Sequence, residues 1–584
     1  MSRAPAVDGG SAGDFRAFLA RDWGDWIQDY PEAGTVLGMP GMNDRWTDDS
    51  DAGIERRRSH LRRSSAELAT FDRERLSADD RLNFDLLRSL FEDATEGEQF
   101  GLDPYPFVSG SPRNLWMPLN QMEGIQASAG DMVELQPRTT RSDYGDLLAR
   151  LRALPRAIAQ NLALLRAGRA RGYTPPRVAV LGVPNQIGNL IPSDPMASAL
   201  LEPFRHIPAA IPEAERARLW TEARTAYSDE VVPAFDVLRE YFRSEYLPAC
   251  RDEVGVSVLP MGRAAYRFLV RQSTTTDLTP EQIHEIGLAE VRRLDTAIEE
   301  LMTRTGFSGT AANFREFLRT DPRFYWSQAA ELLDGYRVIA KKIDPELGRL
   351  FGRLPRLPYG VRPVPAFREA TSPAAYYFSG APSTGRAGTF YANTYQVGVR
   401  PRWEMEALTL HEAVPGHHLQ IALAQELDHL PPFRRESGPT AFIEGWGLYA
   451  ESLGEELGFY RDPYSKMGQL TFDMWRSIRL VVDTGLHAFG WNRERAIQFF
   501  REHTGMSDTG IAVEVDRYIV WPGQALAYKI GQLKFRELRT WAEGRLGDRF
   551  DVRAFHDMVL AEGALPLRRV EQRTQEWVAR RTDH

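Results

Sequence analysis

The chain has 584 residues, 43% of them hydrophobic and 26% charged, which is the composition of a globular protein. This length exceeds that of a usual single core and suggests roughly two to four subdomains. The formal net charge of −8 argues against nucleic-acid binding, which requires a basic surface. The single cysteine, Cys250, excludes a disulfide within the chain and a metal site built from thiolates.

The N-terminal residues lack the apolar core of an export signal. No stretch of about eighteen apolar residues, the length that crosses a membrane, occurs in the sequence. We therefore expect a cytoplasmic protein without membrane association. Residues 1–12, rich in Gly, Ala and Ser, are expected to be disordered. The sequence leaves the oligomeric state open, with a homodimer as one hypothesis.

Most of the chain has the apolar spacing of α-helices. One helix is predicted to begin after Thr279, because Thr279 can act as N-cap, Pro280 suits the first turn and Gln282 completes a capping box. Apolar residues follow it at helical spacing from Ile283 to Leu301. Similar helical patterns occupy residues 55–98, 144–168, 212–247 and 325–346, and proline-rich breaks fall at 174–186, 203–212 and 354–373.

These patterns predict a mainly α fold, a large helical body of the metallopeptidase kind with a small β hairpin or sheet near the metal site described below. A working division separates an N-terminal helical half, residues 13–255, from a C-terminal catalytic half, residues 256–584. A deep central groove between the halves is the expected place for a ligand site.

Residues 373–396 have the pattern strand, turn, strand. An edge strand beside a metal site can pair with the extended backbone of a substrate. Tyr391 and Asn393, on the second strand of this segment, are therefore predicted to bind substrate. The alternative is a hairpin with only a structural role.

The most informative segment, residues 411–420, reads HEAVPGHHLQ. It places imidazoles around a carboxylate, the set that a zinc hydrolase uses to hold its metal and to take a proton from water. His411 is the first predicted ligand, and Glu412 is the predicted general base.

The second imidazole is His417 or His418. A regular helix would bring His418 to the same face as His411, because seven residues are close to two turns. Pro415 removes a helix hydrogen bond and Gly416 adds conformational freedom. A helix interrupted by two residues would instead bring His417 to the metal, and we favour His417.

The third ligand is expected from residues 440–451, which read TAFIEGWGLYAE. Glu444 and Glu451 are seven residues apart and share one helix face among apolar and aromatic neighbours. Two carboxylates on an inward face require a cation. We predict Glu444 as the third ligand and Glu451 as the acceptor that orients a ligand imidazole.

A polar stripe follows between residues 474 and 487. Arg476, Arg479, Asp483 and His487 lie on one helical face. We predict that Arg479 binds substrate or that His487 acts in the site, with Asp483 holding the imidazole. The alternative is a simple pair between Arg479 and Asp483 four residues apart.

The pattern H-E-x-x-P-G-H-H-x-Q followed by F-x-E-G-W-G-x-Y-A-E resembles the bacterial family called domain of unknown function 885. That family is similar to the helical zinc peptidases, or gluzincins, of the thermostable carboxypeptidase, oligopeptidase and angiotensin-converting types. The resemblance covers most of the chain and includes TTTDLTPEQIH at residues 274–284 and GTFYANT at residues 388–394. The metal segment is its most specific part.

The resemblance implies one Zn²⁺ ion held by His411, His417 and Glu444, with Glu412 as general base. Glu444 stands 27 residues after His417 (444 minus 417), close to the spacing in those peptidases. The two-residue insertion that brings in Pro415 departs from their pattern. It leaves the choice of the second imidazole open.

Residues 516–529 hold further candidates. In the similar peptidases a tyrosine from a late segment donates a hydrogen bond to the oxyanion that develops in the transition state. Tyr518 is the first candidate for this role and Tyr528 the second. Gln524 and Lys529 are candidates for binding a carboxylate of the substrate.

The leading hypothesis is a zinc-dependent metallopeptidase that hydrolyses short or unfolded peptides. One alternative is a metal-dependent enzyme that cleaves an amide in a small-molecule metabolite or performs other metal-assisted chemistry. Another is a zinc-stabilised protein that binds peptides without cutting them. Two imidazoles and a carboxylate also suit non-haem iron, but the H-E pairing and the resemblance favour zinc.

Overall fold

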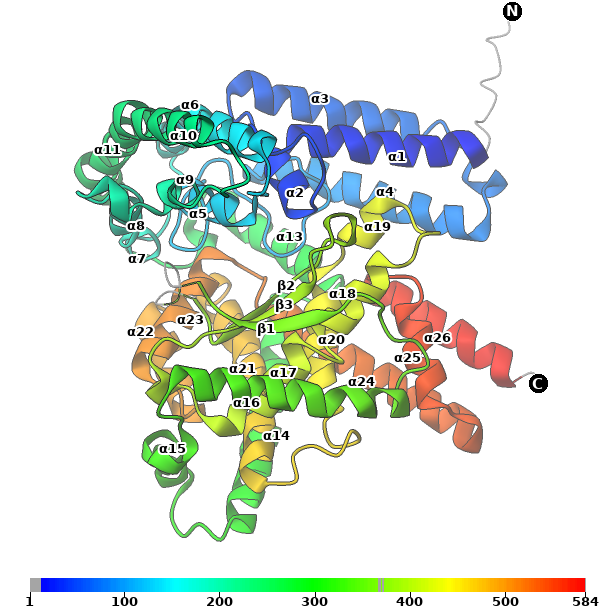
Figure 1. Cartoon of the computed structure of the whole chain (residues 1–584). Helices are drawn as coiled ribbons and strands as arrows, with labels where there is room; N and C mark the ends of the chain where they lie inside the picture. Colours follow the sequence, from blue (N-terminus) through cyan, green and yellow to red (C-terminus); the bar gives the residue numbers. More distant parts are fainter. Residues whose placement is uncertain (1–11, 366–368, 370–371, 583–584) are drawn as a thin grey trace, which may run out of the picture.

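The computed structural model describes residues 12–365, 369 and 372–582, and it is mainly helical with a small three-stranded sheet (Figure 1). The disorder predicted for residues 1–12 falls outside these residues, except for Ala12, which begins the first helix. Within the described residues, every helix is too short or too polar to cross a membrane.

Figure 1 shows the helices of the first 249 residues in the upper part of the view. The helical patterns predicted before residue 250 are confirmed, with the first of them divided at residues 69–77. These helices are α1 (Ala12–Asp29), α2 (Pro31–Val36), α3 (Asp51–Leu68), α4 (Ala78–Gly97), α5 (Ile125–Leu135), α6 (Arg141–Ala170), α7 (Arg177–Val180), α8 (Val183–Leu190), α9 (Glu202–Arg205), α10 (Glu213–Ala226), α11 (Val232–Tyr241) and α12 (Leu247–Ala249).

The remaining helices are α13 (Gly262–Thr274), α14 (Pro280–Arg304), α15 (Ala311–Thr320), α16 (Ala329–Ile343), α17 (Met405–Glu412), α18 (His417–Gln425), α19 (Pro432–Glu436), α20 (Thr440–Ser452), α21 (Pro463–His487), α22 (Arg493–His503), α23 (Asp508–Val520), α24 (Leu526–Leu546), α25 (Val552–Leu560) and α26 (Leu567–Thr582). Most of them lie in the lower part of the view in Figure 1, while α13 and α19 lie nearer the N-terminal helices.

Helix α14 begins as predicted. The hydroxyl of Thr279 accepts from the backbone N–H of Gln282, and the Gln282 side chain accepts from the N–H of Thr279, which completes the capping box. The apolar face from Ile283 to Leu301 is buried and packs along α21. This contact anchors α21, the helix that carries the polar stripe.

The sheet has the order β1-β3-β2, with β1 (Tyr359–Pro363) parallel to β3 (Gly388–Ala392) and β2 (Ala375–Phe378) antiparallel to it. The predicted strand-turn-strand is confirmed as β2 and β3. Strand β1, which lies in a segment interpreted as a proline-rich break, was missed. Because β3 is central, both of its edges are already paired. The strand of Tyr391 therefore has no edge free for a substrate backbone, whereas β1 and β2 each have one unpaired edge among the described strands; substrate binding by Tyr391 and Asn393 stays a prediction.

The hydrophobic core crosses the predicted boundary at residue 255. Its largest cluster joins Trp26 and Phe91 of the N-terminal helices to Trp446 and Phe535. Residues between Leu119 and Cys250 form a second cluster of their own. The first hundred residues thus pack with the C-terminal part of the chain, and the division into two halves stays an interpretation.

Candidate metal centre

The metal motif interrupts a helix. Helix α17 ends at Glu412, the chain leaves helical geometry at Ala413, and α18 begins at His417. Gly416 is required inside this turn, because a Cβ at its position would lie 1.9 Å from the carbonyl oxygen of His411. The indole of Trp446 donates to the carbonyl of Pro415 at 2.8 Å and fixes the turn against α20.

The interruption selects His417 as the partner of His411. His418 is occupied elsewhere: its Nδ1 lies 3.0 Å from the Tyr377 hydroxyl and its Nε2 lies 3.0 Å from the carbonyl oxygen of Leu357. Burial lowers the pKa of His418 to about 4, so the ring is neutral near pH 7. The geometry thus agrees with the choice of His417.

Helix α20 brings Glu444 to the two imidazoles. Glu444 Oε2 lies 3.6 Å from Nε2 of His411 and 3.4 Å from Nε2 of His417. Gly447 permits this approach, since a Cβ there would lie 2.8 Å from the His411 ring. One ligand atom from each of the three residues lies within 4.8 Å of the others.

These three residues fit a zinc ion. Bonds of about 2.0–2.1 Å in tetrahedral geometry separate ligand atoms by about 3.3 Å, close to the two separations given above. Glu444 keeps 20% of its side chain exposed, whereas His411 keeps 3%. The donor set is therefore held by the fold, and the Glu444 side chain is still partly open to solvent.

Glu451 lies behind His411, where an orienting acceptor was predicted. The imidazole Nδ1 donates to Glu451 Oε1 at 2.8 Å, which turns Nε2 toward Glu444. Burial opposes the charged imidazole, but Glu444 and Glu451 outweigh it and raise the pKa of His411 to about 9. Burial likewise opposes the Glu444 carboxylate, yet His411 and His417 hold its pKa well below the usual range.

Replacing Glu451 by Gln is expected to weaken zinc binding about 10- to 100-fold, the usual effect of losing a partner that orients a metal ligand. Competition with a chelator of known affinity measures it. Glu455→Gln is the matched control, because Glu455 is exposed and pairs with Lys466 at 2.9 Å. Equal affinities for the Glu451→Gln protein and the unchanged chain would refute the orienting role.

Glu412 follows His411 directly at the end of α17 and is 8% exposed. Within the described residues its carboxylate has no hydrogen bond or ion pair, yet its charge contributes to the raised pKa of His411. A carboxylate beside the ligands without a partner of its own is what a general base requires.

Tyr518 is enclosed in a polar network. Its hydroxyl donates to Glu514 Oε2 at 2.7 Å and accepts from Arg479 Nε and Trp475 Nε1, both at 3.0 Å. Arg479 also binds Glu514 at 3.2 Å and is 2% exposed. The hydroxyl hydrogen of Tyr518 is therefore engaged by Glu514, and the oxyanion role of Tyr518 and the substrate contact of Arg479 stay predictions.

Arg476 is a neighbour of the centre to which the sequence assigned no role. Its Nη2 lies 3.8 Å from Glu451 Oε1, while its Nε and Nη1 have no hydrogen bond. The guanidinium stacks over the rings of Phe472 and Trp475. The position of Arg476 on the polar stripe could have indicated a role near the site. The sequence did not show that Glu451 would lie opposite it.

The predicted pairing of Asp483 with His487 is wrong. Asp483 accepts from the Tyr266 hydroxyl at 2.6 Å and from the backbone N–H of Gly523 at 3.1 Å. His487 accepts from the N–H of Val256 on Nδ1 and donates from Nε2 to the carbonyl of Tyr518. Because both ring nitrogens bind backbone groups, His487 has the contacts of a structural residue; a catalytic role remains a prediction. The alternative pair of Arg479 and Asp483 does not form either.

Acid is expected to destabilise the fold through two buried imidazoles. Burial lowers the pKa of His487 and of His556 to about 4, whereas an unfolded histidine titrates near 6.5. The native form binds fewer protons, so the free energy of unfolding falls as the pH drops from about 6.5 toward 4, by up to about 3 kcal/mol per residue. Urea unfolding at several pH values measures the slope, which His487→Gln is expected to reduce. The exposed His429→Gln is the control, and an unchanged slope for His487→Gln would contradict the assignment.

Lys529 is not available to a substrate carboxylate. Its ammonium group is fully buried and pairs with Asp473 at 2.5 Å and with Glu290 at 2.8 Å. A buried charge with two partners cannot leave them without a large cost. The predicted role of Lys529 in carboxylate binding is therefore not supported by its contacts.

Gln524 and Tyr528 lie together through Arg517. The guanidinium of Arg517 donates to Gln524 Oε1 at 3.2 Å and to the Tyr528 hydroxyl at 2.9 Å. The Tyr528 hydroxyl accepts this bond, and the described residues show no acceptor for its own hydrogen. Between the two candidate oxyanion donors, the contacts thus favour Tyr528 over Tyr518.

Tyr391 and Asn393 differ in their environment. The ring of Tyr391 is half-buried and stacks on Tyr376, with centroids 5.0 Å apart. Asn393 is buried, and its Nδ2 donates to the carbonyls of Glu369, Ser372 and Pro373. Asn393 therefore organises the loop before β2, whereas Tyr391 retains exposed surface.

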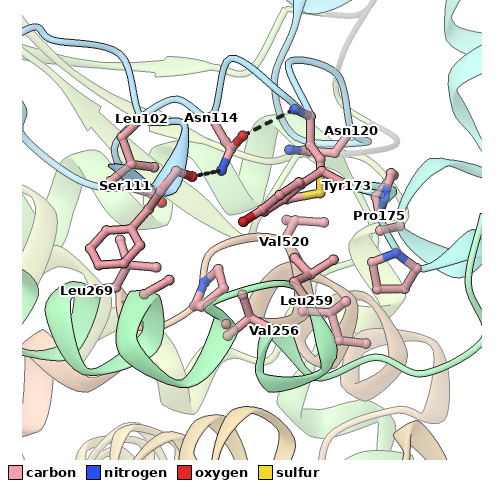
Figure 2. A pocket seen from close by; sticks show the side chains of 18 of the residues that line it. Leu102, Ser111, Asn114, Asn120, Tyr173, Pro175, Val256, Leu259, Leu269 and Val520 are labelled. Atoms are coloured by element: carbon pink, nitrogen blue, oxygen red, sulfur yellow. Dashed lines mark hydrogen bonds between the residues drawn. The ribbon is translucent and has the colours of Figure 1, made fainter. Parts of the chain in front are cut away.

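A small apolar cavity of about 80 Å³ lies among the segment around residues 100–123, helix α13 and the end of α23. Figure 2 shows Leu259, Leu269 and Val520 in its wall, opposite Asn114. Asn114 braces this wall by donating to the carbonyl of Phe100 at 3.3 Å and accepting from the N–H of Trp116 at 2.9 Å. The two imidazoles and Glu444 do not line this cavity.

The fold and the site thus define a mainly helical protein with a candidate His/His/Glu metal centre. The family described as bacterial protein of unknown function (DUF885) matches residues 31–573, and the chain belongs to this family. No curated protein matches the chain.

Solved structures of the same fold are known. The chain is 28% identical to a protein of Colwellia psychrerythraea described as a "putative lipoprotein", with a TM-score of 0.90 over 98% of this chain and 100% of that one. A second protein, a "putative lipoprotein of unknown function" of Shewanella oneidensis, is 16% identical, with a TM-score of 0.70 over 97% and 99% of the two chains. The second likeness concerns the fold alone.

Proposed function

We propose that this protein is a zinc-dependent metallopeptidase acting on short or unfolded peptides. The observation that carries the proposal is the convergence of His411, His417 and Glu444 beside a free carboxylate, that of Glu412. A site with only a structural role would have no use for that carboxylate. Glu451, bonded to His411, adds the support that metal ligands of enzymes commonly have.

Each residue has a proposed task. His411, His417 and Glu444 hold the zinc ion, which when bound polarises a carbonyl and lowers the pKa of water. Glu412 accepts the proton of the attacking water and delivers it to the leaving amine. Tyr528, with an uncommitted hydroxyl hydrogen, is the proposed donor to the oxyanion.

The substrate is proposed to lie in a groove between the N-terminal helices and the metal helices. Its backbone would pair with an open sheet edge, for which β2 is the candidate because it packs against α17, the helix of His411. A narrow groove admits an extended peptide and excludes a folded protein. The cytoplasmic location and the homodimer also remain proposals.

Two measurements on the purified full chain test this function. Elemental analysis is expected to find one zinc ion per chain, and a peptide-library digest followed by mass spectrometry is expected to find cleaved peptides. Small-molecule amides belong in the same screen. Cleavage of amides alone would favour a tailoring enzyme, iron in place of zinc would change the class of chemistry, and peptide binding without cleavage would overturn the peptidase assignment.

A further inference from the structure

A cavity of about 370 Å³ lies among the N-terminal helices, walled by α2, residues 46–49, the segment around residues 103–113, and α5 and α6. Aromatic rings of Tyr30, Trp46, Tyr105 and Phe107 form part of this wall. The centroids of Tyr30 and Tyr105 are 4.5 Å apart, and that of Phe107 is 5.8 Å from Tyr105. These three rings therefore make a continuous aromatic surface.

The charged residues of this aromatic cavity are mostly acidic. Glu32, Asp49, Asp103 and Glu123 line it, with Arg113 as the only cation among the described lining residues. Arg113 is already engaged, because it binds both oxygens of Asp49, at 3.0 and 2.7 Å. Arg113 Nη1 also lies 4.0 Å from Asp103 Oδ2, so this cation is shared between two of the four acidic side chains.

Asp103 has a buried cation nearby. Its Oδ1 accepts from the Tyr30 hydroxyl, and its Oδ2 lies 3.6 Å from Nη2 of the fully buried Arg57. Although Asp103 is only 6% exposed, Oδ2 has no hydrogen bond. Arg57 and Arg113 together balance Asp49 and Asp103.

Glu32 and Glu123 form no ion pair among the described residues, although Arg113 and Arg150 act on Glu32, and Arg113 acts on Glu123, at longer range. Glu32 accepts from the backbone N–H of Thr47 at 3.0 Å and from its hydroxyl at 2.6 Å. Glu123 accepts from Nδ2 of Asn120 at 3.0 Å, and burial raises its pKa. Both side chains are half-buried, so a ligand can reach them. The cavity therefore has two acidic side chains without a cation in direct contact among the described residues.

We propose that this aromatic cavity binds an organic cation, the ammonium or guanidinium group of a substrate peptide. A cation lies favourably against aromatic faces, and carboxylates removed from water gain most from a charged partner. A small anion would meet an excess of acidic side chains, and a neutral apolar ligand would leave Glu32 and Glu123 without a cation in contact. The aromatic and acidic walls thus select for positive charge.

The wall of the aromatic cavity is hydrogen-bonded to residues at the start of α20, the helix that carries Glu444. Ser109, in the wall, donates to the carbonyl of Gly438 at 3.3 Å, and the N–H of Gly110 donates to the Thr440 hydroxyl at 3.0 Å. Thr440 begins α20 and precedes Glu444 by four residues, about 6 Å along the helix. This inference rests on the proposed function in one respect: it makes cationic peptides the preferred substrates.

Calorimetry with three small probes on the unchanged full chain tests the binding directly. N-acetyl-lysine methylamide carries a side-chain ammonium, norleucine methylamide carries only an α-ammonium, and N-acetyl-norleucine methylamide carries neither. At least one charged probe is expected to bind about tenfold more tightly than the neutral one or better, and more weakly at high salt. The stronger charged probe tells whether a side chain or an amino terminus is recognised.

Two variants locate the site. Glu32→Gln and Glu123→Gln are each expected to weaken the charged probe about tenfold and to leave the neutral probe unchanged. Glu576→Gln, an exposed position on α26, is the matched control and is expected to bind as the unchanged chain does. The three probes are compared on the unchanged chain. The proposal can therefore be tested even if a variant misfolds.

The outcomes separate this inference from the proposed function. Equal binding of all three probes, or a charged probe unaffected by both substitutions, would overturn the cation site even if peptides are cleaved. Charge-selective binding lost in the two variants would support it even if the library shows no cleavage. Cleavage enriched for cationic peptides, and reduced for them alone by Glu32→Gln, would support both.

Discussion

Glu412→Gln is expected to lower peptide hydrolysis at least about a hundredfold while zinc remains bound, because general bases contribute about 10²- to 10⁴-fold. Glutamine keeps the size of the side chain but cannot accept the proton of water. The metal ligands are unchanged, so elemental analysis of the variant is expected to find as much zinc as in the unchanged chain. Steady-state rates on the best library peptide give the comparison.

Glu406→Gln is the matched control on the same helix. Glu406 accepts from the backbone N–H of Tyr460 at 2.9 Å, a bond that a glutamine oxygen can also accept. This variant is expected to hydrolyse peptide near the normal rate. Full activity in Glu412→Gln would remove Glu412 from the mechanism, and loss of zinc in that variant would assign it a structural role instead.

Glu444→Ala is expected to have the second large effect, loss of bound zinc together with hydrolysis. A catalytic metal ion stabilises the transition state by several kcal/mol, which corresponds to a rate difference of about a thousandfold or more. His411→Ala and His417→Ala are expected to behave alike, because all three residues are proposed ligands of the ion. Elemental analysis after dialysis and the hydrolysis rate are measured together.

His418→Gln distinguishes the ligand set from its neighbour. His418 binds the Tyr377 hydroxyl and the Leu357 carbonyl, so its loss is expected to lower the melting temperature and to leave zinc in place. Zinc retained by Glu444→Ala, or lost from His418→Gln with His417→Ala still loaded, would refute the proposed ligands.

Local sequence patterns predicted the helices well where one face is apolar throughout. The capping box at Thr279 and the buried face of α14 depend on neighbours within a few residues, which the sequence displays. Strand β1 was missed because its residues lie among prolines, and its pairing partner, β3, is about thirty residues away (388 minus 359 is 29). Pairing between distant segments is not recorded in local spacing.

The candidate site shows the same division. His411, Glu412, Glu444 and Glu451 were predicted from spacing on two helices, and the structure brings the two histidines and Glu444 together as expected. The contacts of Asp483, His487 and Lys529 were predicted wrongly or incompletely. Their partners are Tyr266 in α13, Val256 in the segment before α13, and Glu290 in α14. A polar stripe indicates burial of charge but does not identify the facing group.

The sequence by itself determined the helical character of this protein and the chemical identity of the candidate ligands, because helix periodicity and donor type are properties of neighbouring residues. Only the tertiary structure decided between His417 and His418, placed Glu451 behind His411, and gathered Glu32 and Glu123 around an aromatic cavity. Those arrangements depend on which distant side chains are buried together. In the low-dielectric interior each buried polar group needs a partner, and the packing of the whole chain determines which partner is near.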